Sequence, residues 1–147
     1  MRFLKNIGII SRCTEMYRDD RFRAIGLNSR QAVYLQHICR EPGITQDALG
    51  KNICVNKSNV TRQIALLEEN GYVKRTPDAA DRRQVCVFPT EKAYEILPTI
   101  REGFKVWREY LSEDLTEEEG RILVEALGKI AQKAADYCGR IVTEDTL

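Results

Sequence analysis

The sequence is poor in the residues that most catalytic and metal sites require. It has one histidine, His37, and five cysteines that stand singly, without the spacing of a disulfide framework or a zinc site. Catalysis by a nucleophile and a base would need an orienting group converging with them on one pocket, and the sequence offers no such set. We therefore expect no enzyme, no metal site and no cofactor. Unpaired cysteines favour a reducing, cytoplasmic location.

Long apolar stretches are also missing, which excludes a segment that spans a bilayer. The first residues, Met1–Asn6, contain neither a sustained apolar run nor a small-residue cleavage site, so we expect no secretory signal and no membrane partner. What is present is a globular balance, with 43% hydrophobic and 31% charged residues in 147. This length fits one domain, residues 1–147, with a core of its own.

Charge is unevenly distributed although the formal net charge is only +1. Residues 51–90 contain seven basic and four acidic residues, a net +3, whereas residues 109–119 are rich in glutamate and aspartate. A basic middle segment in a nearly neutral chain indicates a local surface that meets an anion.

Apolar periodicity predicts helices along most of the chain. Amphipathic helices are expected at both ends, within residues 3–17, from 90 to 111 with a kink or break at Pro98, and from 116 to 141. Three shorter helices are predicted between them, residues 30–40, 46–52 and 57–70, capped by Ser29, Thr45 and Asn56, and Gly71 ends the third. Residues 72–75 and 84–88 alternate as strands around a polar loop, which predicts a hairpin. The expected fold class is mainly α with a small β-hairpin wing (α+β), a winged helix-turn-helix.

The helix at 57–70 has the composition of a DNA-reading helix. Outside its apolar stripe lie six polar or basic side chains: Lys57, Ser58, Asn59, Thr61, Arg62 and Gln63. Asn59 and Gln63 can pair with adenine, Arg62 can bind guanine or phosphate, and Ser58 and Thr61 suit phosphates or base edges. The alternative is a plain solvated helix face. The scarcity of acids and the neighbouring basic hairpin favour DNA contact.

The hairpin supplies the second signal. Arg82 and Arg83 lie near its tip, where they could reach a minor groove or phosphates, and we count Arg75 among the DNA contacts as well. Asp81 is interpreted as a carboxylate that orients a neighbouring arginine through a charged hydrogen bond. The alternative is an ordinary loop with a weak surface ion pair.

These motifs closely resemble the MarR family of transcriptional regulators. The resemblance is carried by Val60-Thr61-Arg62, Leu67-Glu68-Glu69-Asn70-Gly71-Tyr72-Val73-Lys74-Arg75, Asp81-Arg82-Arg83 and Pro89-Thr90-Glu91-Lys92-Ala93. Asp81 and Arg83 occupy the family's Asp-x-Arg positions in the wing. Pro89 stands where leucine is usual and Ala93 where glycine is usual, so this chain departs from the family pattern at the exit of the wing.

The resemblance implies a homodimer that binds a pseudo-palindromic operator in double-stranded DNA. The winged lobe would comprise residues 29–92, and residues 1–24 and 93–147 would form the dimerisation helices. The terminal helices carry apolar stripes that a helix-turn-helix core does not need, which independently favours a partner surface over packing within the chain.

The resemblance also implies a ligand-responsive repressor with a small aromatic effector bound between the dimerisation helices and the lobe. Candidate pocket residues, each of which could instead be core, are Tyr17, Phe22, Tyr34, His37, Phe104 and Trp107. Two alternatives stay open: a redox-responsive regulator of the same fold, and a winged-helix module for protein interaction. Cys13 is the best redox candidate because Arg12 and Arg18 are near it, although its helical phase favours a buried, inert thiol.

Overall fold

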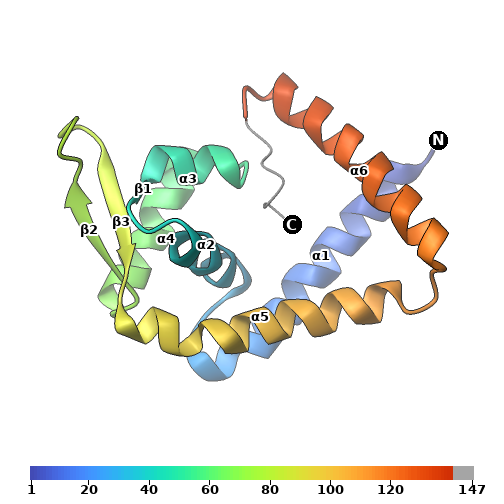
Figure 1. Cartoon of the computed structure of the whole chain (residues 1–147), viewed down its shortest axis with the longest axis horizontal. Helices are drawn as coiled ribbons and strands as arrows, with labels where there is room; N and C mark the ends of the chain where they lie inside the picture. Colours follow the sequence, from blue (N-terminus) through green and yellow to red (C-terminus); the bar gives the residue numbers. More distant parts are fainter. Residues whose placement is uncertain (141–147) are drawn as a thin grey trace.

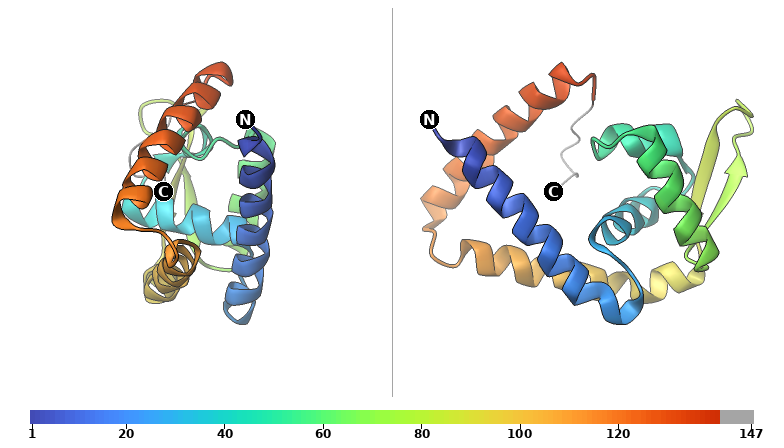
Figure 2. Two further views of the ribbon diagram at one scale, coloured as in Figure 1. Left: turned by 90° about the vertical axis from the view of Figure 1, so that its right-hand side faces the viewer. Right: turned by 180° about the vertical axis from the view of Figure 1, so that it is seen from behind.

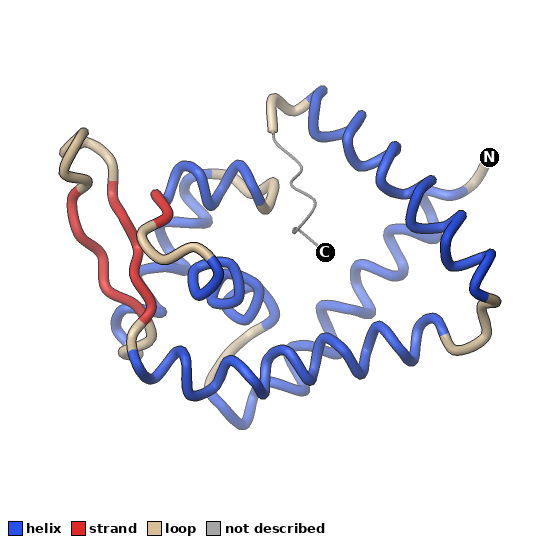
Figure 3. Tube along the Cα trace, viewed as in Figure 1, coloured by secondary structure: helices blue, strands red, loops and turns tan. Residues whose placement is uncertain are grey.

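The computed structural model describes residues 1–140. The predicted end of the last helix, Ile141, and the remainder of the predicted dimerisation segment lie outside the described residues. The chain is mainly helical, with one small antiparallel sheet (Figures 1 and 3), so the predicted fold class is confirmed. The elements in order are α1 (Phe3–Phe22), η1 (Arg23–Ile25), α2 (Ser29–Arg40), β1 (Ile44–Thr45), α3 (Gln46–Asn52), α4 (Lys57–Glu69), β2 (Val73–Pro77), β3 (Val85–Pro89), α5 (Glu91–Ser112) and α6 (Glu117–Tyr137).

Side-chain caps start the helices, as the sequence indicates. Thr45, Asn56 and Thr116 each accept a hydrogen bond from the backbone N–H three residues on. The predicted cap of α2 is wrong by one residue: Asn28 caps this helix and Ser29 is its first residue. The Asn28 side chain accepts from the Gln31 N–H at 2.9 Å while Gln31 reaches back to the Asn28 N–H at 3.1 Å, so a reciprocal capping pair decides the start.

Helix α5 runs unbroken through Pro98, so of the two predicted alternatives the break is wrong, and the kink stays a prediction. Leu97 and Ile100 flank the proline and are both buried against the lobe. Their packing holds the helix together where the proline removes a backbone donor. α5 is therefore one continuous helix that connects the lobe to α6 (Figure 1).

The sheet has three strands in the order β1-β3-β2, one more than the predicted hairpin. β1 is only two residues long, with Ile44 opposite Val87 and Thr45 opposite Cys86. β2 and β3 pair antiparallel from Val73 opposite Pro89 to Pro77 opposite Val85. We call this β2–β3 hairpin, residues 73–89, the wing. Because β1 directly precedes α3, the pairing ties the wing to the helix-turn-helix.

The core lies in the lobe and extends to Phe22 of α1 and to Ala93, Leu97 and Ile100 of α5. Fully buried side chains from α2, α3, α4 and the sheet meet there, among them Tyr34, Leu35, Ile38, Leu49, Ile64, Leu67 and Val87. α1 and α5 cover one side of the lobe, whereas α6 stands apart from it (Figure 2). Within α6 the buried residue is Ala135. Across residues 1–140, the structure contains no helix with the length and apolar character needed to cross a bilayer.

Candidate nucleic-acid interface

The start of α4 is held in place by a tight turn after α3. Cys54 in this turn has a φ of 55°, a left-handed conformation that non-glycine residues seldom adopt. The Val55 N–H then donates to the Gly50 carbonyl at 3.0 Å, and a Cβ at Gly50 would lie 3.1 Å from Val60. The close approach of α3 and α4 therefore requires a small residue at position 50, and it presents the first turn of α4 at the surface.

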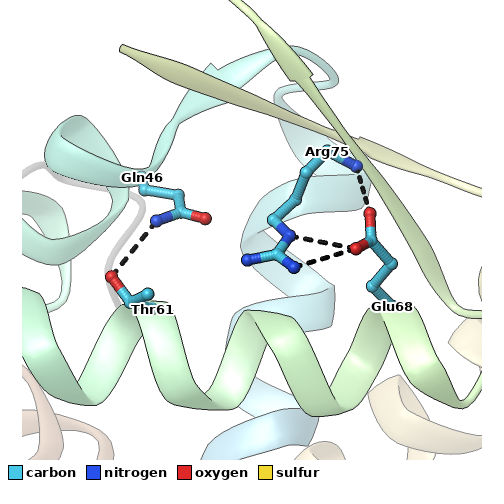
Figure 4. A network of polar contacts seen from close by, with 4 residues as sticks. All are labelled: Gln46, Thr61, Glu68 and Arg75. Carbon is cyan, nitrogen blue, oxygen red and sulfur yellow. Dashed lines mark hydrogen bonds and ion pairs between the residues drawn. The ribbon is translucent and has the colours of Figure 1, made fainter. Parts of the chain in front are cut away.

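Four of the six predicted α4 residues are exposed on this first turn and the next: Lys57, Ser58, Thr61 and Arg62. Thr61 also accepts a hydrogen bond from Gln46 of α3 at 3.3 Å (Figure 4), which links the two helices of the motif. These four side chains present two hydroxyls and two positive charges, which suits phosphates and base edges.

Asn59 and Gln63 do not lie on that face, and here the interpretation of the sequence is corrected. Asn59 is 7% exposed and Gln63 is 8% exposed. On a helix, residues 59, 60, 63, 64 and 67 share one side, so the buried face of α4 is wider than its apolar stripe and includes two amides. As they stand, these amides face the lobe and not the solvent.

Asn59 is held by a buried tyrosine. The Tyr34 hydroxyl on α2 donates to the side-chain oxygen Oδ1 of Asn59 at 2.5 Å. Burial raises the pKa of Tyr34, and the positive charges of Arg30 and Arg62 oppose that shift in part. The hydroxyl therefore keeps its proton at neutral pH and acts as a donor to α4.

At the tip of the wing, Asp81 binds Arg83. Its carboxylate accepts from the Arg83 backbone N–H, Nε and terminal nitrogen, each at 3.1 Å. These hydrogen bonds hold the pKa of Asp81 below its ordinary value. The Arg83 side chain is nevertheless 89% exposed, so it is fixed in direction while its charge stays available. Arg82 is exposed beside it.

Arg75, predicted to contact DNA, is partly exposed and forms an ion pair with Glu68 (Figure 4). Its Nε and terminal nitrogen donate to one oxygen of Glu68 at 3.1 and 2.9 Å, and its backbone N–H donates to the other at 2.8 Å. Glu68 belongs to α4 and Arg75 to β2, so the pair fixes the wing against the recognition helix. Sequence reasoning missed Glu68 as a partner of Arg75. The two opposite charges stand seven residues apart, on either side of the glycine that ends α4, and this spacing was the available signal.

Four of the six residues predicted to line an effector pocket instead pack against one another between α1 and α5. Tyr17 stacks on Trp107 with 4.5 Å between ring centroids, and Phe22 meets Phe104 edge-on at 5.7 Å. The Trp107 indole N–H donates to Thr14 at 2.8 Å. These aromatic side chains therefore fill the space between the two helices. His37 is half-buried on α2.

Tyr34, the sixth of these residues, lines a cleft of about 390 Å³ between α1 and α2. The cleft has a mixed lining, which includes Ser11, Thr14, Arg18, Arg30, Tyr34 and Val55. Arg18 lies over the Phe104 ring, 4.5 Å from its centroid, and its buried Nε has no hydrogen-bond partner among residues 1–140. Sequence reasoning missed Arg18 as part of this surface, and nothing in the spacing of residues signals it.

Cys13 is exposed on α1, so the expectation of a buried thiol is wrong. The broad solvent-facing side of α1 includes it, because this helix packs on α2 and α5 along one narrow edge. Cys39 is the buried cysteine in the described chain, and burial raises the pKa of its thiol.

Fold and interface together define a winged helix-turn-helix protein: a recognition helix with an exposed polar edge beside a wing with an oriented arginine. Comparison with known proteins agrees. The family model described as "MarR family" matches residues 27–85. The transcriptional regulator HosA of Escherichia coli O157:H7 is 32% identical over 105 residues, which cover 71% of this chain and 77% of HosA.

Solved structures show the same relationship. A MarR protein from Peptoclostridium difficile superposes with a TM-score of 0.91 at 27% identity, covering 93% of this chain and 90% of its own. A MarR family transcriptional regulator from Listeria monocytogenes, solved in complex with a 26mer DNA, superposes with a TM-score of 0.86 at 28% identity. The match covers 90% of this chain and 89% of the Listeria chain. The chain belongs to the MarR family of transcriptional regulators. The expectation that it is not an enzyme agrees with this class.

Proposed function

We propose that this protein is a sequence-specific regulator that binds a pseudo-palindromic operator in double-stranded DNA as a homodimer and represses transcription. The observation that carries the proposal is the joint exposure of Ser58, Thr61 and Arg62 on α4 and of the braced Arg83 on the wing. A helix in the major groove and an arginine beside it at the backbone or minor groove is the docking mode of this fold. That a MarR relative was solved with a 26mer DNA supports the proposal.

The homodimer is supported by apolar surface that the protomer leaves uncovered. Exposed hydrophobic side chains gather on the terminal helices, among them Leu4, Ile9, Ile10, Tyr110, Leu111, Leu115, Ile122, Leu123, Val124 and Leu127. Helix α6 has a strong apolar side and still buries only Ala135 in the described chain. Apolar surface of this extent on a small protein is typical of a subunit interface. Two protomers joined there would present two recognition helices to one duplex.

For ligand response, the α1–α2 cleft is the best candidate site for a small aromatic effector. Glu15 also lines the cleft and pairs with Arg30 at 3.5 Å, so the charge of Arg30 is already offset. Arg18, whose buried Nε has no hydrogen-bond partner among residues 1–140, is the cation that would suit the anionic group of an aromatic compound. Titration of the DNA complex with aromatic carboxylates would test this. Release of DNA by a compound, and loss of that response in Arg18→Met, would support the site. Equal release from Arg18→Met would place the effector elsewhere.

One observation favours the redox alternative, namely the exposure of Cys13 on α1. Mass spectrometry after mild peroxide, paired with a DNA-release assay, tests it. Oxidation of Cys13 together with release that Cys13→Ser abolishes would establish a thiol trigger. Release without modification of any cysteine would exclude it.

The first experiment is selection from a pool of randomised duplexes by the purified protein, with salt varied and stoichiometry measured. We expect enrichment of a pseudo-palindrome bound by two chains, with affinity that falls steeply as salt rises because phosphate contacts release counterions. Absence of both enrichment and salt-dependent binding would refute the proposal and favour a protein-interaction module.

A further inference from the structure

A buried hydrogen bond joins α2 to α4, and the proposed DNA contacts leave it unexplained. Tyr34 is 1% exposed and Asn59 is 7% exposed, so neither side chain is at the surface in this structure. They are nevertheless hydrogen-bonded to each other, with the tyrosine hydroxyl as donor and the side-chain oxygen Oδ1 of the asparagine as acceptor. A buried, directional bond of this kind permits one relative position of the two groups, whereas apolar contacts tolerate sliding.

Asn59 occupies the first turn of α4, the turn that presents the exposed polar edge. Its backbone N–H donates to the cap residue Asn56 at 2.8 Å, and Ser58 and Thr61 lie on the opposite side of the same turn. A shift of Asn59 therefore shifts the side chains that face the solvent. Two hydrogen bonds therefore hold this turn in position: one from Tyr34 of α2 to the Asn59 side chain, and one from the Asn59 backbone N–H to the cap residue Asn56.

Helix α2 carries Tyr34, and α2 is the element between the recognition helix and the terminal helices. It packs against α1 and α5 on one side and against α4 on the other. In a dimer built on the terminal helices, the distance between two recognition helices depends on how α4 sits on α2. A fixed spacing matters because two half-sites on one duplex must be reached together.

We infer that Tyr34 is a positioning residue for operator recognition: its hydroxyl, acting through Asn59, sets the place of the first turn of α4 relative to α2. The inference rests on the proposed function and deepens it. Asn59, interpreted from the sequence as a base-reading residue, acts through its buried bond to Tyr34 and not by contact with a base.

Tyr34→Phe tests this, with Tyr72→Phe as the matched control. Both changes remove one hydroxyl from a buried tyrosine and keep the ring; the Tyr72 hydroxyl donates to the Ile25 carbonyl at 2.8 Å, away from α4. The bond is formed before DNA binds, so its net energy of about 0.5–1.5 kcal/mol is the upper limit of what positioning by it can add to binding, and operator affinity should fall up to about two- to tenfold in Tyr34→Phe. Tyr72→Phe should bind the operator like the wild type.

Affinity for a scrambled duplex of equal length separates positioning from folding. Non-specific binding depends on charge, which neither change alters, so Tyr34→Phe should keep its scrambled-duplex affinity and its salt slope. Equal losses on both duplexes would show only a smaller folded fraction and would overturn the inference. So would equal operator affinities for Tyr34→Phe and Tyr72→Phe. Failure of the wild type to prefer any duplex would instead refute the proposed function.

Asn59→Ala gives an independent readout, even if Tyr34→Phe does not fold. A positioning role predicts a similar loss at every base pair of the half-site, and no further loss when both changes are combined. Loss of preference at a single base pair would show that Asn59 reads a base and would overturn the inference.

Discussion

Glu68 on α4 and Arg75 on β2 form a closed ion pair, in which both carboxylate oxygens accept hydrogen bonds from the same arginine. The arginine side chain is 33% exposed and the glutamate side chain 36%, so the pair lies at the edge of the lobe (Figure 4). It joins the recognition helix to the first strand of the wing by side-chain and backbone contacts. The pair therefore helps to fix the position of the wing relative to α4.

Glu68→Gln should destabilise the fold in a pH-dependent way. The hydrogen bonds from Arg75 hold the pKa of Glu68 below its ordinary value of 4.5. The pair therefore adds stability above pH 4.5, and this contribution is lost as the pH falls from 4.5 through the folded pKa. We expect a loss of about 1 kcal/mol at pH 7, reduced by partial solvent exposure. Urea unfolding at several pH values measures it.

The control is Glu69→Gln, an exposed glutamate next along the same helix, which should change the free energy of unfolding little. A difference between wild type and Glu68→Gln that stays constant into acid would contradict the ion-pair interpretation.

Asp81→Ala should weaken DNA binding although it removes a negative charge from the wing. The carboxylate holds the Arg83 side chain through two hydrogen bonds. Without it the arginine samples more rotamers in the free protein and loses more conformational entropy when it binds DNA. Arg83→Ala should weaken binding further and lower the salt slope by about one. Fluorescence anisotropy over a salt series measures both quantities.

Asp78→Ala is the matched control, because it removes the same charge from the same loop without touching Arg83. Simple electrostatics predicts tighter binding for both aspartate variants. If Asp81→Ala binds more tightly, as Asp78→Ala should, then Asp81 does not orient Arg83 for DNA.

Leu123→Glu combined with Leu127→Glu should convert a dimer into a monomer. The two leucines lie four residues apart on α6, 45% and 38% exposed in the protomer, so charges there would be buried without partners in an interface. Sedimentation velocity gives the oligomeric state. Lys133→Glu, an exposed change on the same helix, should remain dimeric. Unchanged sedimentation of the double variant would place the interface elsewhere.

Gly103→Ala should destabilise the contact between α1 and α5. A Cβ at this position would lie 2.7 Å from the Phe22 ring, which is fully buried and packs edge-on against Phe104. The expected cost is about 1–3 kcal/mol, the range for overpacking a core. Thermal unfolding measures it, with the exposed Thr99→Ala on the same helix as control. Similar melting temperatures for the two variants would show that Phe22 has room to move.

Local signals in the sequence were sufficient to predict most helices and the hairpin of the fold. The caps at Thr45, Asn56 and Thr116 were predictable because each side chain binds a backbone group within its own first turn. The left-handed Gly71, with a φ of 81°, ends α4 for an equally local reason. Strand β1 was missed since two residues carry no periodicity, and the strand exists only because β3 lies beside it.

The candidate site was predictable only in part. Sequence alone determined which residue types α4 and the wing contain, and that Asp81 is two residues from Arg83, close enough for a local hydrogen bond. Tertiary structure decided which partner each of them binds: it buries Asn59 against Tyr34 and pairs the partly exposed Arg75 with Glu68. Both partners lie on other elements, and an amide or a guanidinium is as well satisfied by a partner within the protein as by DNA. Composition therefore cannot distinguish a side chain that binds within the protein from one that is available to DNA. The packing of α2, α4 and β2 makes that distinction.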